Sequence, residues 1–375
     1  MPAPSSRPIL FTPETFAMQI WGGVSHSYVR VGEALAALHR PPHFFAGLHG
    51  NRHLEDAQGL TITGARIGKI KNLWKLNLNL SRLWLRLWCL RHPGALIHDT
   101  YYWAPYRKFR GAGPYVVCVW DMIAEIYGQE SGWSERARHA RREAVDCADA
   151  IIVPSLSTAQ DLQRLWSVDP ARMVVAPLGV MRRQAPAWTP PPWPFVLHVG
   201  GRSRYKDFES TYRTVALLRR EGREIGLVCF GSPLKTAEKK AVVAAGIPLE
   251  RIIEETGTDE RLAGIYAAAV ALLYPSHYEG FGMPILEAMM QDCPVLCTDT
   301  PACLEAAGGA ALVSRCGDVE SFAAHLRLLL DHPQERARLI RTGRQRAESQ
   351  PWSTTATGYL TAYALAEKNF QLRQG

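Results

Sequence analysis

Two carboxylates at a fixed spacing flank a glycine-rich turn. Glu279 and Glu287 lie eight positions apart. Between them stand Gly280, Phe281, Gly282 and Pro284. The apolar run around the proline predicts a helix, because proline is well tolerated in a first helical turn. Backbone N–H groups at such a helix start can bind an anion with help from the helix dipole. A phosphate that carries a hydroxyl-bearing sugar on each side, as in a nucleotide-diphosphate sugar, fits between these two carboxylates.

The complete segment resembles the E-x7-E motif of the retaining family 4 glycosyltransferases. A bare pair of glutamates would suit a solvated helix equally well, but the full string favours the motif. The resemblance implies an α/β GT-B fold, in which two Rossmann-like doubly wound domains face an interdomain cleft. It also implies that Glu279 is the catalytic-site carboxylate that holds sugar hydroxyls, and that Glu287 holds the ribose hydroxyls. The donor diphosphate is then expected against Gly280, Phe281 and Gly282.

A second candidate loop follows the strand expected at residues 195–199. Gly201 permits a close backbone approach, Arg202 offers paired donors, and Lys206 offers a point charge for phosphate. The spacing is not that of a Walker loop. The loop resembles the Gly-Gly-Arg…Lys-(Asn/Asp)-Phe segment of the same family, which implies that Arg202 and Lys206 bind the donor pyrophosphate. Without the resemblance, a solvated turn would explain it as well.

A glycine pair near the N-terminus precedes a predicted helix. Gly22 and Gly23 resemble the Gly-Gly loop that lies near the donor phosphate and the acceptor in these transferases. The family often has arginine at the position of His26.

The clearest departure from the family pattern lies at Trp120. Many relatives read Val-His-Asp where this chain reads Val-Trp-Asp. Asp121 remains in place, and His98 follows a strand expected at residues 95–97. We therefore expect Asp121 and His98 on the acceptor side as candidate catalytic residues, with a structural role for His98 as the alternative.

Apolar strand-like runs alternate with helical segments along both halves of the chain. This alternation predicts a parallel doubly wound sheet in each half, with ligands bound at the carboxyl ends of the strands. A capping box is expected at residues 157–160. The predicted organisation is an acceptor-side domain, a linker with five prolines in eleven residues, a donor domain, and a helix that returns to the first domain: 1–183, 184–194, 195–350 and 351–375.

Composition limits the class of protein. The chain has 375 residues, of which 47% are hydrophobic and 21% charged, as in soluble globular proteins. No apolar run reaches the roughly 18 residues that a spanning helix needs, and residues 1–8 lack a signal-peptide core. We therefore expect a cytoplasmic protein. The eight cysteines are scattered without a knuckle spacing, which favours reduced thiols over zinc ligands or disulfides.

A basic segment carries much of the net charge of +8. Seven basic residues and no acidic one occur between Arg66 and Arg91: Arg66, Lys69, Lys71, Lys75, Arg82, Arg86 and Arg91. Leucines and the tryptophans Trp74, Trp84 and Trp88 alternate with them. This mixture is typical of a helix in a membrane interface. A core helix with a basic outer face is the alternative, while the leucine density argues against a nucleic-acid partner.

The resemblance implies sugar transfer from a nucleotide-diphosphate donor to a glycan or lipid-linked glycan in bacterial surface polysaccharide assembly, with GDP-mannose as the first choice of donor. No Asp-x-Asp lies near the motif, so neither a metal nor a cofactor is expected, and protein cations would take their place. Trp120 motivates one alternative, a catalytically silent sugar-nucleotide-binding subunit of a membrane-bound assembly complex. A phosphorylase on the same fold is disfavoured, because no context for a pyridoxal lysine is evident.

Overall fold

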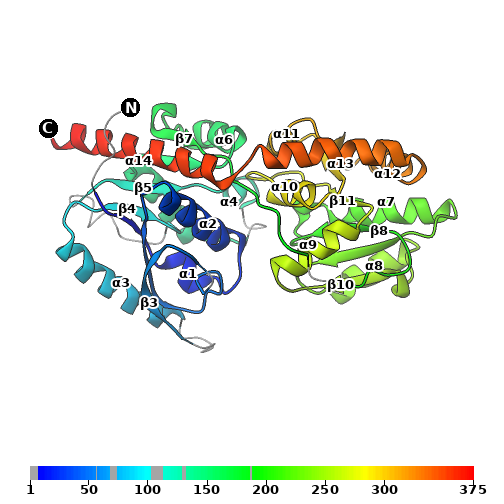
Figure 1. The fold of residues 1–375 in the computed structure, drawn as a ribbon, viewed down its shortest axis with the longest axis horizontal. Coiled ribbons are helices and arrows are strands. Elements are labelled where there is room, and N and C mark those ends of the chain that lie inside the picture. Colours follow the sequence, from blue (N-terminus) through cyan, green and yellow to red (C-terminus); the bar gives the residue numbers. More distant parts are fainter. Residues whose placement is uncertain (1–6, 56, 68–73, 103–112, 129–131, 186–187) are drawn as a thin grey trace. The chain divides into compact units, whose positions relative to one another are not determined.

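Two compact units make up the structure. The computed structural model describes residues 7–55, 57–67, 74–102, 113–128, 132–185 and 188–375. Unit 1 comprises Met1–Gly179 with Trp352–Gly375, and unit 2 comprises Val180–Pro351. Each unit contains one parallel sheet with helices around it (Figure 1). The prediction of two Rossmann-like α/β domains is therefore confirmed.

The sheet of unit 1 has the order β3-β2-β1-β4-β5-β6-β7, and every described pair is parallel. Its strands are β1 Ile9–Phe11, β2 His43–His49, β3 Thr61–Arg66, β4 Leu96–Asp99, β5 Tyr115–Cys118, β6 Ala150–Val153 and β7 Met173–Val175. The last four match strands expected from their apolar runs. The bounds of β1 to β3 were not expected, since β1 is short and β3 is a polar, largely exposed edge strand.

The helices of unit 1 are α1 Glu14–Met18, α2 Gly23–Ala37, α3 Trp74–Arg91, α4 Ile123–Ile126, α5 Glu135–Cys147, α6 Leu156–Trp166 and α14 Trp352–Gln374. The start of α6 corrects one expectation. Its N-cap is Ser155, whose hydroxyl accepts a hydrogen bond from the Thr158 N–H at 3.0 Å. The capping box expected at residues 157–160 therefore lies inside the helix.

The sheet of unit 2 has the order β10-β9-β8-β11-β12-β13 and is also parallel. Its strands are β8 Phe195–Val199, β9 Gly226–Phe230, β10 Ile252–Glu255, β11 Ala271–Tyr274, β12 Val295–Thr298 and β13 Leu312–Ser314. Its helices are α7 Phe208–Arg220, α8 Thr236–Ala244, α9 Asp259–Ala268, α10 Met283–Met290, α11 Pro301–Ala307, α12 Val319–Asp331 and α13 Pro333–Glu348. The strand order reverses between β8 and β11.

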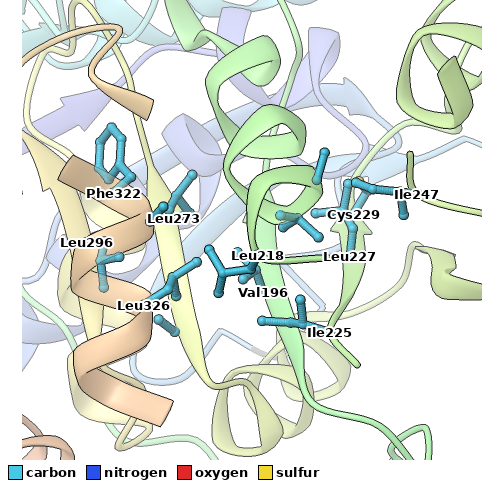
Figure 2. Close-up of a cluster of buried hydrophobic side chains, with 14 of the residues drawn as sticks. Val196, Leu218, Ile225, Leu227, Cys229, Ile247, Leu273, Leu296, Phe322 and Leu326 are labelled. Carbon is cyan, nitrogen blue, oxygen red and sulfur yellow. The ribbon is translucent and has the colours of Figure 1, made fainter. Parts of the chain in front are cut away.

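A buried apolar cluster holds this second sheet to its helices. Figure 2 shows strand side chains such as Leu273 and Leu296 beside Phe322 and Leu326 of α12, with Leu218 of α7 among the same group. All five are fully buried. Burial of one such side chain contributes about 1.5–3 kcal/mol, so the cluster fixes the strands whose ends carry the candidate site.

The proline-rich segment 184–194 groups with unit 2. Residues 186–187 lie outside the described chain. The Trp188 indole N–H donates to Glu255 Oε1 at 3.0 Å, and its ring lies 5.5 Å from that of Phe195. Trp193 lies against the backbone of Gly226. These tryptophans attach the described part of the segment to the second sheet.

Helix α14 packs along unit 1, with its buried side chains directed to the sheet side. The Thr355 hydroxyl donates to the Pro177 carbonyl at 2.7 Å, and Arg373 pairs with Asp149 at 2.8 Å. The start of the helix approaches Gly179 so closely that a Cβ there would lie 2.5 Å from Trp352 N. Glycine is therefore required at this contact.

We predict that Gly179→Ala destabilises the protein. The added methyl group would meet backbone atoms, which cannot move aside as a flexible side chain can, and such overpacking costs about 1–3 kcal/mol. Denaturant unfolding measures the change. Leu372→Ala, at a position 71% exposed near the end of α14, is the control and should change stability little. Equal stability of the Gly179 variant and the wild type would contradict the close contact.

Candidate active site

The two candidate loops of unit 2 meet at the ends of neighbouring strands. β8 pairs with β11 in parallel, and β9 lies on the other side of β8. The chain leaves β8 through Gly201, Arg202 and Lys206, and it leaves β11 towards Glu279 and α10. In doubly wound sheets, ligands bind at the carboxyl ends of strands where the strand order reverses. The fold therefore places both predicted donor-binding loops at the expected edge.

An ion pair joins the two loops. The Lys206 ammonium lies 2.6 Å from Glu279 Oε1 and donates to the Tyr274 hydroxyl at 3.3 Å. Glu279 is only 7% exposed. Burial lowers the pKa of Lys206, but the charge of Glu279 and its hydrogen bond raise that pKa, and the net shift is upward. Lys206 therefore stays charged beside a carboxylate that it orients.

Helix α10 begins at a glycine that has a left-handed backbone. Gly282 is the N-cap with φ 101°, a conformation that side-chain-bearing residues rarely adopt. Gly282 has no side chain that could bond an amide of the turn, Pro284 has no N–H, and the Ile285 N–H donates to the Gly282 carbonyl at 3.0 Å. Phe281 is buried directly before it. The turn thus presents a helix start suited to an anion, close in sequence to Glu279.

Glu287 lies one turn further along α10, on a partly buried face. The Tyr266 hydroxyl donates to Glu287 Oε2 at 3.4 Å. Burial raises the pKa of Glu287 to about 7, and the charge of Asp259 adds to this rise. The charge of Arg183 lowers the pKa of Glu287, and the same arginine forms an ion pair with Asp259 at 2.9 Å. The carboxyl is thus close to its titration point at neutral pH.

Arg202 has a different environment from Lys206. Its Nε donates to Glu238 at 3.1 Å, and its Nη2 donates to the carbonyls of Ser232 and Pro233, each at 2.7 Å. These bonds tie the β8–α7 loop to the β9–α8 loop. Arg202 thus links the two loops, while its buried Nη1 has no hydrogen-bond partner among the described residues, and the expected contact of Arg202 with phosphate stays a prediction. Gly201 beside it is exposed.

Gly22 and Gly23 lie at the start of α2 in unit 1, where Gly22 is the N-cap. The side chain of Gln19 crosses this start, and its Oε1 accepts from the Ser25 N–H at 3.0 Å. A Cβ on Gly22 would lie 2.3 Å from that oxygen. The glycine is thus needed for a glutamine cap. His26 follows on the same helix and is mostly buried.

His98 lies in the core of unit 1. Its side chain is fully buried, its Nδ1 lies 3.0 Å from the Tyr363 hydroxyl, and its ring stacks on Tyr359 at 5.4 Å. Burial lowers the pKa of His98 to about 3. A neutral, fully buried histidine packed against α14 fits the structural alternative, and the catalytic role of His98 stays a prediction.

Asp121 and Trp120 follow the end of β5. Asp121 Oδ1 accepts from the Ile123 N–H at 3.0 Å, so the carboxylate caps the short helix α4. The ring of Trp120 packs edge-on against Tyr28 at 5.1 Å. Asp121 remains only partly buried. Asp121 and Trp120 thus both keep partial exposure, whereas His98 is fully buried.

The sequence interpretation missed three residues of the unit 2 site. Tyr274 forms a hydrogen bond with Lys206, and Tyr266 forms one with Glu287. Arg183 pairs with Asp259, and its charge acts on Glu287. Tyr274 ends a predicted strand, which was a usable signal. Arg183 had been assigned to the end of the first domain, so nothing in the pattern connected it to Glu287.

The described residues form neither a metal-ligand cluster nor a membrane-spanning helix. Within those residues, no group of three or more His, Cys, Asp or Glu side chains could hold a metal ion. The described helices include none that is both long and apolar enough to cross a membrane. All eight cysteines are free, and six of them are buried.

Two family models match the chain in tandem. "Glycosyltransferase Family 4" matches residues 21–182, and "Glycosyl transferases group 1" matches residues 188–346. Together they cover every strand of both sheets except β1. The chain belongs to the family 4 glycosyltransferases of GT-B fold.

Relatives of this glycosyltransferase include enzymes that make several glycans. It is 25% identical over 315 residues to O-antigen chain mannosyltransferase B of Escherichia coli, and the match covers 74% of this chain and 76% of that protein. It is 28% identical over 265 residues to a D-inositol 3-phosphate glycosyltransferase of Kineococcus radiotolerans, covering 62% and 61%. A match to an MMP alpha-(1->4)-mannosyltransferase of Mycolicibacterium hassiacum, at 29% identity, covers 58% of this chain and 54% of that one.

Solved structures share the fold of this glycosyltransferase. A sucrose-phosphate synthase from Thermosynechococcus elongatus superposes with a TM-score of 0.74 at 18% identity, covering 96% and 98% of the two chains. WaaG, described as a glycosyltransferase involved in lipopolysaccharide biosynthesis, gives 0.67 at 18% identity with 98% and 100% coverage. Anabaena HepE in complex with UDP and glucose gives 0.72 at 14% identity, covering 96% and 99%.

We predict that Glu287→Gln changes how the stability of this glycosyltransferase depends on pH. Because the pKa of Glu287 is raised from 4.5 to about 7, the folded protein keeps a proton that the unfolded chain releases. Its contribution to stability is thus full below the unfolded pKa and is lost as the pH rises through about 7. The variant should gain melting temperature relative to wild type between about pH 5 and pH 8.

Glu250→Gln provides the matched control, since Glu250 is exposed. Its melting temperature should follow that of wild type over the whole pH range. A Glu287 variant that also follows wild type would show that this carboxyl titrates normally.

Proposed function

We propose that this chain transfers a hexose, with retention at the anomeric carbon, from a nucleotide-diphosphate sugar to a glycan or lipid-linked glycan of a bacterial surface polysaccharide. The observation that carries the proposal is the Lys206–Glu279 ion pair beside the glycine-capped start of α10. A cation, an anion and a helix N-terminus at one sheet edge are the groups that a sugar phosphate requires. Family membership supports the same reaction class.

The reaction assigns a task to each of these groups. The bond from the anomeric carbon to the phosphate oxygen breaks, and the acceptor oxygen bonds to that carbon on the same face. The acceptor proton passes to the leaving phosphate oxygen. Lys206 and the backbone amides of the glycine turn that leads into α10 stabilise the charge that develops on the diphosphate, as preorganised donors do in many sites. The Glu279 carboxylate accepts hydrogen bonds from hydroxyls of the transferred sugar, and Glu287 accepts them from the ribose hydroxyls.

GDP-mannose is the donor that we propose first. The mannosyltransferase of the Escherichia coli O-antigen supports mannose, whereas the UDP bound to Anabaena HepE makes uridine nucleotides the main rival. We further propose that transfer needs neither a metal nor a cofactor, because Lys206 and the helix start supply positive charge. The nucleotide is therefore the first property to test.

We predict that a nucleoside diphosphate stabilises the protein in the presence of EDTA. A ligand at 100 times its dissociation constant adds about 2.7 kcal/mol to the free energy of unfolding. GDP, UDP and ADP are compared by thermal shift, and the best one by calorimetry. Glu287→Ala should weaken binding by about 1.5–3 kcal/mol, the usual contribution of a charged hydrogen bond, whereas Glu250→Ala should not.

Two results would count against this donor site. One is binding that appears only after magnesium or manganese is added back. The other is an unchanged affinity of the Glu287 variant while its fold is intact.

A second candidate function is a sugar-nucleotide-binding subunit without catalysis. It rests on Trp120, which stands where many relatives have histidine and packs against Tyr28. A protein that binds the nucleotide but transfers no sugar to any glycan acceptor would favour this second function.

We also propose that the outer face of α3 contacts an anionic membrane, which would make this a cytoplasmic protein that is peripheral on the inner face of the plasma membrane. One face of α3 packs on the sheet through Leu78, Ser81 and Leu85. The opposite face carries an apolar stripe whose members are 43% to 78% exposed: Leu80, Leu83, Trp84, Leu87 and Leu90.

Exposed cations accompany this stripe. Arg86 and Arg91 lie on the same helix, and α3 contains no acidic residue. Apolar residues with adjacent basic ones suit a lipid interface. Lys69 and Lys71 lie outside the described residues. Trp88, expected as an anchor, stacks on His92 at 3.8 Å and is partly buried, so Trp84 and the leucines carry the proposal.

We predict co-sedimentation with anionic vesicles and weak binding to neutral ones. Each basic residue near the surface adds roughly 1 kcal/mol, and the apolar stripe should keep part of the binding at high salt. Leu83→Glu with Leu87→Glu should abolish the salt-resistant part while the protein stays folded. Leu156→Glu, at an exposed leucine of α6, is the matched control. If wild-type protein does not bind anionic vesicles at low salt, α3 is an ordinary surface helix and the proposal is wrong.

A further inference from the structure

The loop before α2 presents an indole ring to solvent. Trp21 is 54% exposed and directly precedes Gly22, the N-cap of that helix. Trp21 belongs to unit 1, whereas Lys206, Glu279, Glu287 and the start of α10 belong to unit 2.

The backbone that carries Trp21 is held in place. The Asn51 amide donates to the Gln19 carbonyl at 2.7 Å, and the Arg52 N–H donates to the Ile20 carbonyl at 3.0 Å. Asn51 itself is fully buried. The loop that follows β1 and α1 is therefore tied to the loop that follows β2. The ring is exposed on a fixed support, which reduces the entropy lost when a ligand binds.

Two imidazoles lie beside the indole. The ring of His53 lies 5.1 Å from that of Trp21 in an edge-on arrangement, and the ring of His26 lies 5.2 Å from that of His53. Arg30 Nε donates to His26 Nε2 at 3.2 Å, so the neutral His26 ring carries its proton on Nδ1. The group formed by Trp21, His26 and His53 thus places two imidazole rings beside an exposed aromatic face.

This combination matches a pyranose ring. The axial C–H groups of one sugar face are apolar and carry slight positive charge, so they stack on the negative face of an indole. The hydroxyls around the ring need polar partners such as imidazole nitrogens. The group also follows β1 and β2 at the carboxyl edge of the unit 1 sheet, where doubly wound domains bind ligands.

We propose that Trp21, with His53 and His26, forms a subsite for a pyranose of the acceptor glycan. The assignment of this sugar to the acceptor rests on the proposed function, since the donor residues lie in unit 2. Trp21 is the stacking platform, and the two histidines orient the hydroxyls.

Fluorine NMR of protein that contains 5-fluorotryptophan tests the subsite directly. The chain has 11 tryptophans, and Trp21→Phe identifies the resonance of Trp21 by its loss. The probes are the methyl pyranosides of mannose, glucose, galactose, rhamnose and N-acetylglucosamine, with open-chain sorbitol as the control. The Trp21 resonance should move saturably with at least one pyranoside and not with sorbitol. A resonance that no pyranoside moves would overturn the proposal.

Saturation-transfer NMR of the active pyranoside then separates stacking from a structural role. Trp21→Ala should weaken its binding roughly two- to tenfold, and Trp21→Tyr should restore most of it. Leu156→Ala, an exposed position elsewhere in unit 1, should leave binding unchanged. Equal binding by the Trp21→Ala variant would overturn the subsite.

An exposed indole could also bind a nucleotide base or lipid. Calorimetry with the best nucleoside diphosphate tests the first, and vesicle sedimentation tests the second. Trp21→Ala should retain full nucleotide affinity and full vesicle binding. A loss of nucleotide affinity would show that Trp21 contacts the donor base, and a loss of vesicle binding would show that it contacts lipid. Either result would overturn the acceptor assignment. If wild-type protein binds no nucleotide at all, the proposed function fails, while the pyranoside titration still reports on the subsite.

Discussion

The ion pair between Lys206 and Glu279 is the contact on which the donor site depends. It connects the loop after β8 to the loop after β11 at the edge where the strand order of unit 2 reverses. A mostly buried pair of this kind contributes little net stability, because desolvation offsets the attraction, but loss of one partner leaves a buried charge. We infer that the pair is kept for its geometry, which holds a cation and a carboxylate ready for a charged ligand.

The rest of unit 2 serves to keep these two loops in place. The apolar cluster of Figure 2 fixes the strands, Arg202 binds the neighbouring loop, and Gly282 allows the chain to turn into α10. The pKa of Glu287, raised to about 7 by burial, shows that the same edge is also partly desolvated. A site of this kind strengthens interactions with a diphosphate, since the local dielectric is low.

The strands, turn and helix around the candidate donor site were predicted well because their sequence signals are local. The spacing of Glu279 and Glu287 and the glycines before Pro284 determine a turn and a helix without reference to the rest of the chain. Parallel strands such as 195–199 and 271–274 were found from continuous apolar runs, and the structure has both. The side-chain environments of Arg202 and His98 were harder to predict. Their hydrogen-bond partners, Glu238 and Tyr363, lie far away in the sequence. No local pattern indicates such partners.

A crystal structure with a bound nucleoside diphosphate tests the central claim most directly. The account predicts that the diphosphate lies against the backbone amides of the glycine turn that leads into α10 and that the Lys206 ammonium turns from Glu279 to a phosphate oxygen. The ribose hydroxyls should then lie within hydrogen-bond distance of the Glu287 carboxylate. A diphosphate bound away from α10, with the Lys206–Glu279 pair unchanged and Glu287 without contact, would contradict the account.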